Sequence, residues 1–355
     1  MPDYEPAVIL SACRLPIAIA GGALSALSAV DLGAVVVREA TRRSGLGASD
    51  LGDVILGCVW PETLGLNVGR SAACRAEVPP DVPGETVNRL RGSGLQSVVH
   101  AVEATRVGYT EVVLAGGAES MSHVSEATRL DALKLWRDNT PSPSDIEARF
   151  GVSCHDQAEW LTAQRALAET ALSDGRFAAE LVPIDRGEGP SGPRHVVAVD
   201  DLACADTPAV EQDNAAALIV ATAERAARSG RPPLARILSF ASTGTDAAGA
   251  ATIQATVTTK ALGRAKLDAA HIDLLEMNET FAGQALVAAR TLAIDPSRVN
   301  RHSAAFSLGL CPGAAGARLL VTLVHALRAR GGGHGVAALD AGQQMGLAMV
   351  IAVDG

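Results

Sequence analysis

The stretch that decides the fold is Thr-Val-Asn-Arg-Leu-Arg-Gly-Ser-Gly-Leu-Gln at residues 86–96. It begins in an expected strand at 85–90 and passes through a glycine turn at 92–94. The residues from 95 to 107 then have the apolar spacing of a helix. A further apolar run at 111–117 ends in two glycines and predicts the next strand. The order strand, glycine turn, helix, strand is that of a βαβ unit.

A unit with the same order of elements occurs near the end of the chain. It has a glycine turn at 313–316, an expected helix at 317–330 and an expected strand at 335–339. Residues 340–342 follow, and they end in glycine as the first unit does. The two units are alike in order but weakly alike in identity, so the sequence predicts two similar α/β halves.

Strands and helices alternate through the rest of the chain, except in its middle. We expect strands at 7–11, 53–57, 235–242 and 272–276, and helices at 31–44, 156–172, 214–227 and 282–292. Continuous apolar strands between helices are typical of a parallel sheet that is covered on both faces. Residues 122–213 are richer in turns, which indicates an insertion between an N-terminal half (1–121) and a C-terminal half (214–355).

Composition excludes several classes of partner. Of the 355 residues, 48% are hydrophobic and 19% are charged, so the chain can bury a large core. The net charge of −9 argues against nucleic-acid and anionic-membrane partners, since both need a basic surface. No apolar run reaches the length of about 18 residues that a membrane span needs. Residues 1–5 lack the basic start of a signal peptide, and we therefore expect a cytoplasmic protein.

The spacing of cysteines and histidines predicts no metal site and no bound cofactor. There is no Cys-x-x-Cys pair, and the histidines lack zinc-ligand spacing. Gly92 and Gly94 form half of a dinucleotide-binding fingerprint, but Ser97 replaces its third glycine, which favours tight packing instead. Cys311, in a glycine-rich turn, is the thiol best placed to act as a nucleophile, with a small buried residue as the alternative.

Asn278 and Glu279 are polar at a place where the pattern predicts burial. They follow the expected strand at 272–276 and precede the expected helix at 282–292. Buried polar groups need partners or a function, so these two are candidate site residues. The alternative is a helix N-cap with a glutamate in the first turn.

Several segments resemble those of the thiolase family, and the likeness runs from end to end. Residues 7–17 resemble the family's opening strand, 86–96 its nucleophile segment and 116–122 the segment that ends its first half. Residues 278–282 resemble its Asn-Glu-Ala-Phe motif. The resemblance implies a thiolase-like α/β fold, with two similar βαβ halves in a five-layered α-β-α-β-α arrangement and an inserted loop domain.

The resemblance also assigns residues to the family's catalytic positions. Arg91 stands at the position of the nucleophilic cysteine, Leu310 at that of the histidine and Asp340 at that of the acid/base cysteine. Asn278 is retained, and the backbone N–H of Gly342 would belong to an oxyanion hole. A guanidinium has no lone pair with which to take an acyl group. The resemblance therefore implies a protein unable to carry out thiolysis or Claisen condensation.

Two kinds of function follow from this resemblance. The first is a non-catalytic, acyl-CoA-related subunit or binding protein, a homodimer whose candidate partners are an active thiolase or a small acyl-CoA-binding protein. The second is an acyltransferase-like enzyme of altered chemistry, performing acyl transfer or decarboxylation with Arg91 and Asp340 or with Cys311. Coenzyme A would enter as part of the substrate. Basic residues that could meet its phosphate, or merely aid solubility, are Arg129, Lys134 and Arg137.

The two replaced cysteine positions make a geometric prediction. In the thiolase fold those positions meet at the floor of one pocket, so Arg91 and Asp340 should form an ion pair within about 4 Å. A bidentate contact would suit the arginine fork, and pairing would offset the cost of burying either charge alone. In the alternative, Arg91 turns to solvent and Asp340 accepts local backbone N–H groups.

Overall fold

The computed structural model describes residues 6–61, 66–137, 141–185, 196–201, 211–281, 283–301, 308–309 and 311–355, and of 132–137 the backbone alone. Within them one mixed sheet has the order β10-β11-β12-β9-β1-β8-β5-β3-β4, with β2 attached to β8. Its strands are β1 (Ala7–Arg14), β2 (Ala18–Ile19), β3 (Asp53–Gly57), β4 (Gly84–Val87), β5 (Val112–Ser120), β8 (Gln212–Ala221), β9 (Ala235–Gly244), β10 (Leu274–Met277), β11 (Gly333–Gly342) and β12 (Met345–Val353). A separate ribbon joins β6 (Ile184–Asp185) to β7 (Val196–Val197).

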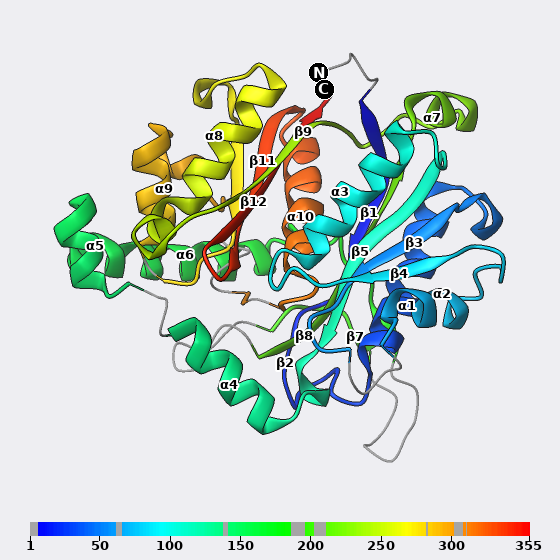
Figure 1. Ribbon diagram of the computed structural model, residues 1–355, viewed down its shortest axis with the longest axis horizontal. Coiled ribbons are helices and arrows are strands. Elements are labelled where there is room, and N and C mark those ends of the chain that lie inside the picture. The colour runs from blue at the N-terminus through cyan, green and yellow to red at the C-terminus, as the bar shows by residue number, and fades with distance from the viewer. Residues whose placement is uncertain are drawn as a thin grey trace.

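Helices form a central layer and two outer layers around the two halves of the sheet (Figure 1). The central helices α3 (Ser93–Arg106) and α10 (Ala315–Ala329) share one hydrophobic core with strands of both halves. The outer helices are α1 (Ala29–Ser44) and α2 (Val68–Arg75) on the first half, and α8 (Ile253–Ala265) and α9 (Gln284–Leu292) on the second. The five layers implied by the resemblance are confirmed. No helix in the described residues combines the length and apolarity needed to cross a membrane.

The predicted parallel sheet is only partly parallel, because the sheet is mixed. β3 is parallel to β4 and β5, and β10 to β11, as βαβ connections require. The remaining pairs are antiparallel. Between β11 and β12 the physical reason is a short turn at Gln343 and Gln344, both at positive φ, because so short a connection can only reverse the chain.

The prediction of a helix over 214–227 is wrong. Residues 212–221 form β8, which is buried along its whole length and pairs with β1 and β5 of the first half-sheet. Only α7 (Ala223–Ser229) is helical there. The alanines of this segment suggest a helix, but they also fit a strand that is packed closely on both faces. Such a strand lacks the alternation of polar and apolar residues that usually marks a strand in a sequence. β8 thus starts within the expected insertion and ends beyond residue 214.

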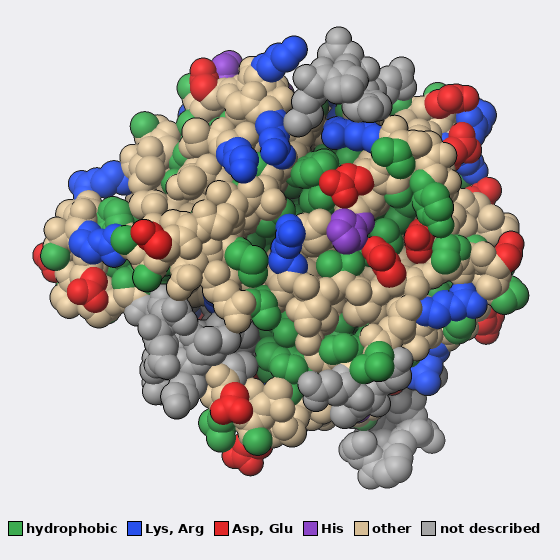
Figure 2. Space-filling model, viewed as in Figure 1, with side chains coloured by type: hydrophobic (Ala, Val, Ile, Leu, Met, Phe, Trp, Pro, Cys, Tyr) green, Lys and Arg blue, Asp and Glu red, His purple; other side chains and the backbone are tan. Residues whose placement is uncertain are grey.

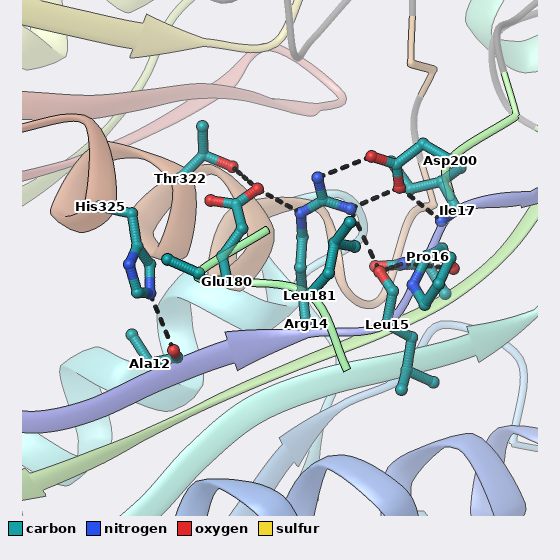
Figure 3. A network of polar contacts seen from close by, with 12 residues as sticks. Ala12, Arg14, Leu15, Pro16, Ile17, Glu180, Leu181, Asp200, Thr322 and His325 are labelled. Atoms are coloured by element: carbon teal, nitrogen blue, oxygen red, sulfur yellow. Dashed lines mark hydrogen bonds and ion pairs between the residues drawn. The ribbon is translucent and has the colours of Figure 1, made fainter. Parts of the chain in front are cut away.

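The inserted segment contains α4 (Glu126–Arg137), α5 (Pro143–Phe150) and α6 (Cys154–Ser173), and a buried arginine anchors it to the first strand (Figure 3). Arg14 donates from Nε to Glu180 at 2.6 Å and from its two Nη atoms to Asp200 at 2.5 and 2.8 Å. Thr322 of α10 donates to Glu180 as well. First strand, insertion and central helix therefore share one buried polar network.

Glycines allow the two halves to approach each other where α3 and α10 begin. A Cβ at Gly94 would lie 2.9 Å from the carbonyl oxygen of Gly313, and one at Gly316 would lie 2.7 Å from the backbone nitrogen of Leu95. A Cβ at Gly117 of β5 would overlap the same Gly313 carbonyl. Such contacts have no room for a side chain, so the junction between the halves depends on these glycines.

Replacing Gly117→Ala should destabilise the protein by about 3 kcal/mol or prevent folding, since a methyl group would meet backbone that cannot move aside. Gly263→Ala in α8, where a Cβ meets nothing within 4 Å, is the matched control and should stabilise by up to about 1 kcal/mol. Denaturant unfolding of both variants checks the pair. Equal stability of Gly117→Ala and the wild type would contradict the close-packed junction.

Candidate active site

A turn of the first half and the end of strand β11 of the second half meet at the N-terminal end of α3. The backbone N–H of Arg91 donates to the carbonyl of Ala341 at 3.1 Å. A Cβ at Gly92 would lie only 3.0 Å from the Cβ of Ala341, so glycine permits this approach. The turn around Arg91 thereby touches the end of β11, which also carries Asp340.

The predicted ion pair between Arg91 and Asp340 is confirmed. Arg91 Nη2 lies 3.3 Å from Asp340 Oδ2, with side chains 6% and 16% exposed. The bidentate geometry is not formed, because Oδ1 of Asp340 accepts the backbone N–H of Gly342 at 2.9 Å. Asp340 thus forms an ion pair with Arg91 and also accepts a backbone N–H. The sequence had suggested these two interactions as alternatives.

Neutral donors surround the same oxygen of Asp340. Thr280 Oγ1 and Gln284 Nε2 each lie 3.4 Å from Oδ2. Gln284 Oε1 in turn accepts the backbone N–H and the hydroxyl of Thr280, at 2.7 and 3.0 Å. Oδ2 of Asp340 therefore lies among side-chain donors of Arg91, Thr280 and Gln284. The sequence analysis did not single out Thr280 or Gln284, although Thr280 departs from the Ala of the family motif.

Asn278 holds the end of strand β11 that contains Asp340. Its Nδ2 donates to the carbonyl of Asp340, and its Oδ1 accepts the N–H of Asp340, both at 2.9 Å. Gln254 of α8 donates to the side chain and the carbonyl of Asn278, at 2.8 and 2.7 Å. Two parallel hydrogen bonds to one residue fix the position of Asp340. In this geometry Asn278 positions the end of β11.

Glu279 is a buried anchor, and the N-cap alternative for Asn278 and Glu279 is wrong. Helix α9 begins at Gln284, beyond both residues. Glu279 Oε1 accepts the indole N–H of Trp160 at 2.7 Å, and Oε2 accepts Nδ2 of Asn300 at 2.8 Å. Burial raises the pKa of Glu279 to about 7, and these two donors oppose that rise. Since Trp160 lies on α6, Glu279 ties the insertion to the second half.

The hydrogen bonds of Cys311 are made to residues other than Arg91 and Asp340. Its Sγ is 3.5 Å from the carbonyl of Glu119 and 3.7 Å from that of Asn214, and the residue is 1% exposed. Burial, with the nearby charge of Glu119, raises the pKa of this thiol well above its usual range. In the described part of the chain, no three His, Cys, Asp or Glu side chains are grouped for a metal ion.

The remaining predicted residues are only partly described. Arg129 on α4 forms an ion pair with Glu211 at 3.6 Å. Lys134 and Arg137 lie on the same helix, but their side chains fall outside the description. Leu310 also lies outside the described residues. Gly342 has a positive φ of 94°, which glycine adopts readily, and its N–H is the donor to Asp340.

Two further buried charged residues had no signal in the sequence. Glu276 of β10 and Arg318 of α10 are both 0% exposed, and neither carboxylate oxygen of Glu276 nor any guanidinium nitrogen of Arg318 has a hydrogen-bond partner among the described residues. Burial raises the pKa of Glu276 to about 8, although Arg318 opposes this. Burial and the like charge of Arg14 lower the pKa of Arg318 to about 10. No spacing in the sequence joins these two positions.

Comparison with known proteins agrees with the fold and with the motifs. The family model for the thiolase N-terminal domain matches residues 7–140, and that for the thiolase C-terminal domain matches residues 231–353. The chain therefore belongs to the thiolase family.

Its similarity to individual family members covers nearly the whole chain. The acetyl-CoA acetyltransferase of Escherichia coli (strain K12) is 34% identical, over 97% of this chain and 98% of that protein. The 3-ketoacyl-CoA thiolase of Bacillus subtilis (strain 168) is 33% identical, over 98% and 99%. The crystal structure of the Bacillus anthracis acetyl-CoA acetyltransferase superposes with a TM-score of 0.88 at 28% identity and covers 99% of both chains.

The raised pKa of Glu276 predicts a stability that falls with rising pH. The folded protein keeps a proton that the unfolded chain releases above a pKa of about 4.5, so unfolding becomes easier as pH rises towards about 8. Arg318, Glu180 and Glu279 are the charged groups that act on Glu276. Glu276→Gln should remove this component and should be more stable than the wild type at about pH 8.

Denaturant unfolding across about pH 5–8 measures this effect. Glu159→Gln, which removes an exposed carboxylate on α6, is the matched control and should follow the wild type. A constant difference between Glu276→Gln and the wild type at every pH would contradict the prediction.

Proposed function

We propose that this thiolase-family protein carries out neither thiolysis nor Claisen condensation and acts as a non-catalytic, acyl-CoA-related subunit or binding protein. The observation that carries the proposal is the ion pair of Arg91 and Asp340, because the resemblance puts these residues where the family has its two catalytic cysteines. An arginine cannot form an acyl-enzyme intermediate. A carboxylate in place of the second cysteine lies against that arginine.

The hydrogen bonds around the ion pair support a closed site. The Gly342 N–H, which would serve an oxyanion hole, donates to Asp340 Oδ1 at 2.9 Å. The side-chain amide of Asn278 is used by the backbone of Asp340. Oxyanion catalysis needs donors that are free to meet a developing charge. In this arrangement the expected oxyanion donor, the Gly342 N–H, and the side-chain amide of Asn278 both already have partners within the protein.

The alternative enzyme, with acyl transfer or decarboxylation through Arg91 and Asp340 or through Cys311, has less support. Cys311 is buried, and its pKa is raised, so little thiolate is present to attack a thioester. Asp340 is the more accessible group, and Thr280 and Gln284 lie near its Oδ2. It is therefore the residue through which this alternative would act.

The proposal includes binding of a coenzyme A thioester and a homodimer. It also includes a partnership with an active thiolase or a small acyl-CoA-binding protein, and a cytoplasmic location. The acetyltransferases and thiolases to which the chain is similar are named for coenzyme A thioesters. Arg129 forms an ion pair with Glu211, so a phosphate that contacts Arg129 would have to displace or share this ion pair.

The purified protein should show no thiolysis of acetoacetyl-CoA above the rate without protein, since no nucleophile is in place. Loss of the substrate's absorbance measures this, with the Escherichia coli acetyl-CoA acetyltransferase assayed in parallel as the active control. Calorimetric titration with acetyl-CoA tests binding separately. Turnover that disappears in Cys311→Ser would overturn the proposal and show that Cys311 is the nucleophile. Turnover that disappears in Asp340→Asn would overturn it in favour of the alternative enzyme that acts through Asp340.

Arg91→Cys alone should not restore condensation or thiolysis. The new thiol would lie beside the carboxylate of Asp340, whose negative charge raises a neighbouring thiol pKa. Catalytic groups that act as a unit recover little when only one of them is returned. The triple variant Arg91→Cys, Leu310→His, Asp340→Cys shows whether the scaffold can still support the chemistry. Measurable turnover by the single variant would refute the prediction.

The protein should be a homodimer formed at the edge of the sheet where β4 lies. β4 has no further strand beyond it among the described residues, and an open edge favours pairing with a second copy. Hydrophobic side chains gather in the middle of the face that includes α3 and β4 (Figure 2). Light scattering checks the mass. A monomer, or a tetramer held by residues 122–191, would count against this assembly.

A further inference from the structure

A pocket of about 690 Å³ lies at the opposite end of α3 from the ion pair. Its wall includes Thr105, Arg106 and Tyr109 from the end of α3 and the turn beyond it, and Thr222 from the start of α7. Arg91 precedes the first turn of α3, which is 14 residues long. At 1.5 Å per residue the helix spans about 21 Å, so the pocket is separate from the candidate active site.

Arg106 is the member of this wall whose charge is left without a partner. None of the hydrogen bonds or ion pairs among the described residues ends on its guanidinium, and its Nε is buried and unsatisfied. The guanidinium carbon lies 5.7 Å from the ring centre of Phe240, which stacks a face of the group. Partial burial lowers the pKa of Arg106, although the charge of Glu103 opposes this. A half-buried, unpaired guanidinium gains free energy from an anion that reaches it.

The acidic residues of the wall, in contrast, have their own partners. Asp50 lies 3.2 Å from Arg225, and Glu111 and Glu224 lie 2.6 and 2.9 Å from Arg228. Arg225 offsets the charge of Asp50, and Arg228 is shared by Glu111 and Glu224, so each of these carboxylates already contacts a guanidinium. Arg106 is the only cationic side chain in the lining of the pocket among the described residues, and it has no such partner.

We propose that this pocket binds a small organic anion, a carboxylate or a phosphate, against Arg106. A planar guanidinium presents two parallel N–H groups that match either kind of anion. The hydroxyl of Thr222 accepts the Arg225 N–H, which leaves its own proton free to donate to a ligand. The exposed ring of Tyr109, 65% accessible, provides an apolar wall for the organic part. The volume is that of a pocket for a small molecule.

The test is equilibrium binding of inorganic phosphate and of acetate to the full chain at low ionic strength. Isothermal titration is done with the wild type, Arg106→Gln, Arg106→Lys and Arg165→Gln. The last variant removes an exposed arginine of α6 and is the matched control for net charge. Circular dichroism and unfolding without ligand establish that each variant is folded.

We expect saturable binding of at least one probe with a dissociation constant below about 10 mM, weakened by added salt. Arg106→Gln should weaken that binding by about tenfold or more, Arg106→Lys should weaken it less, and Arg165→Gln should leave it unchanged. Absence of saturable binding of either anion by the wild type would overturn the proposal. Equal binding by a folded Arg106→Gln would overturn it too, since the anion would then sit elsewhere.

Discussion

The structure depends on the close approach of its two halves where α3 and α10 begin. Gly94 and Gly316 leave backbone facing backbone there, and Gly117 admits the Gly313 carbonyl. No side chain fits into these contacts, so the halves cannot slide apart or rotate without losing the packed central layer. That constraint brings the turn around Arg91 against the end of β11. The candidate active site is therefore a consequence of how the halves join.

Charge placed at such a junction has to be compensated within the protein. Arg91 and Asp340 meet there with little exposure, and either one alone would be costly to bury. The same rule explains the network around Arg14, where two carboxylates face one guanidinium. Glu276 departs from the rule, because it makes no hydrogen bond to the nearby Arg318. Burial raises its pKa to about 8, although Arg318 opposes this rise. Among the described residues, buried charges are thus paired at Arg14 and at Arg91, whereas Glu276 and Arg318 have no hydrogen-bond partner.

Much of this could be predicted from the sequence, for physical reasons. Glycine turns before helices mark the two units, and opposite charges at positions that a thiolase brings together predict the ion pair of Arg91 and Asp340. β8 could not be recognised, because its alanines favour helix and its burial on both faces removes the alternation typical of strands. The contact of Trp160 with Glu279 joins residues 119 positions apart, and no local pattern reports such a pairing.

The central claim is that Arg91 and Asp340 act as a pair that closes the site, and a double-mutant cycle measures this most directly. Unfolding free energies are compared for the wild type, Arg91→Met, Asp340→Asn and the double variant. If the residues compensate each other, the double variant loses less than the sum of the single losses, with a coupling of at least about 1 kcal/mol. Additive losses, with a coupling within about 0.5 kcal/mol of zero, would contradict the account.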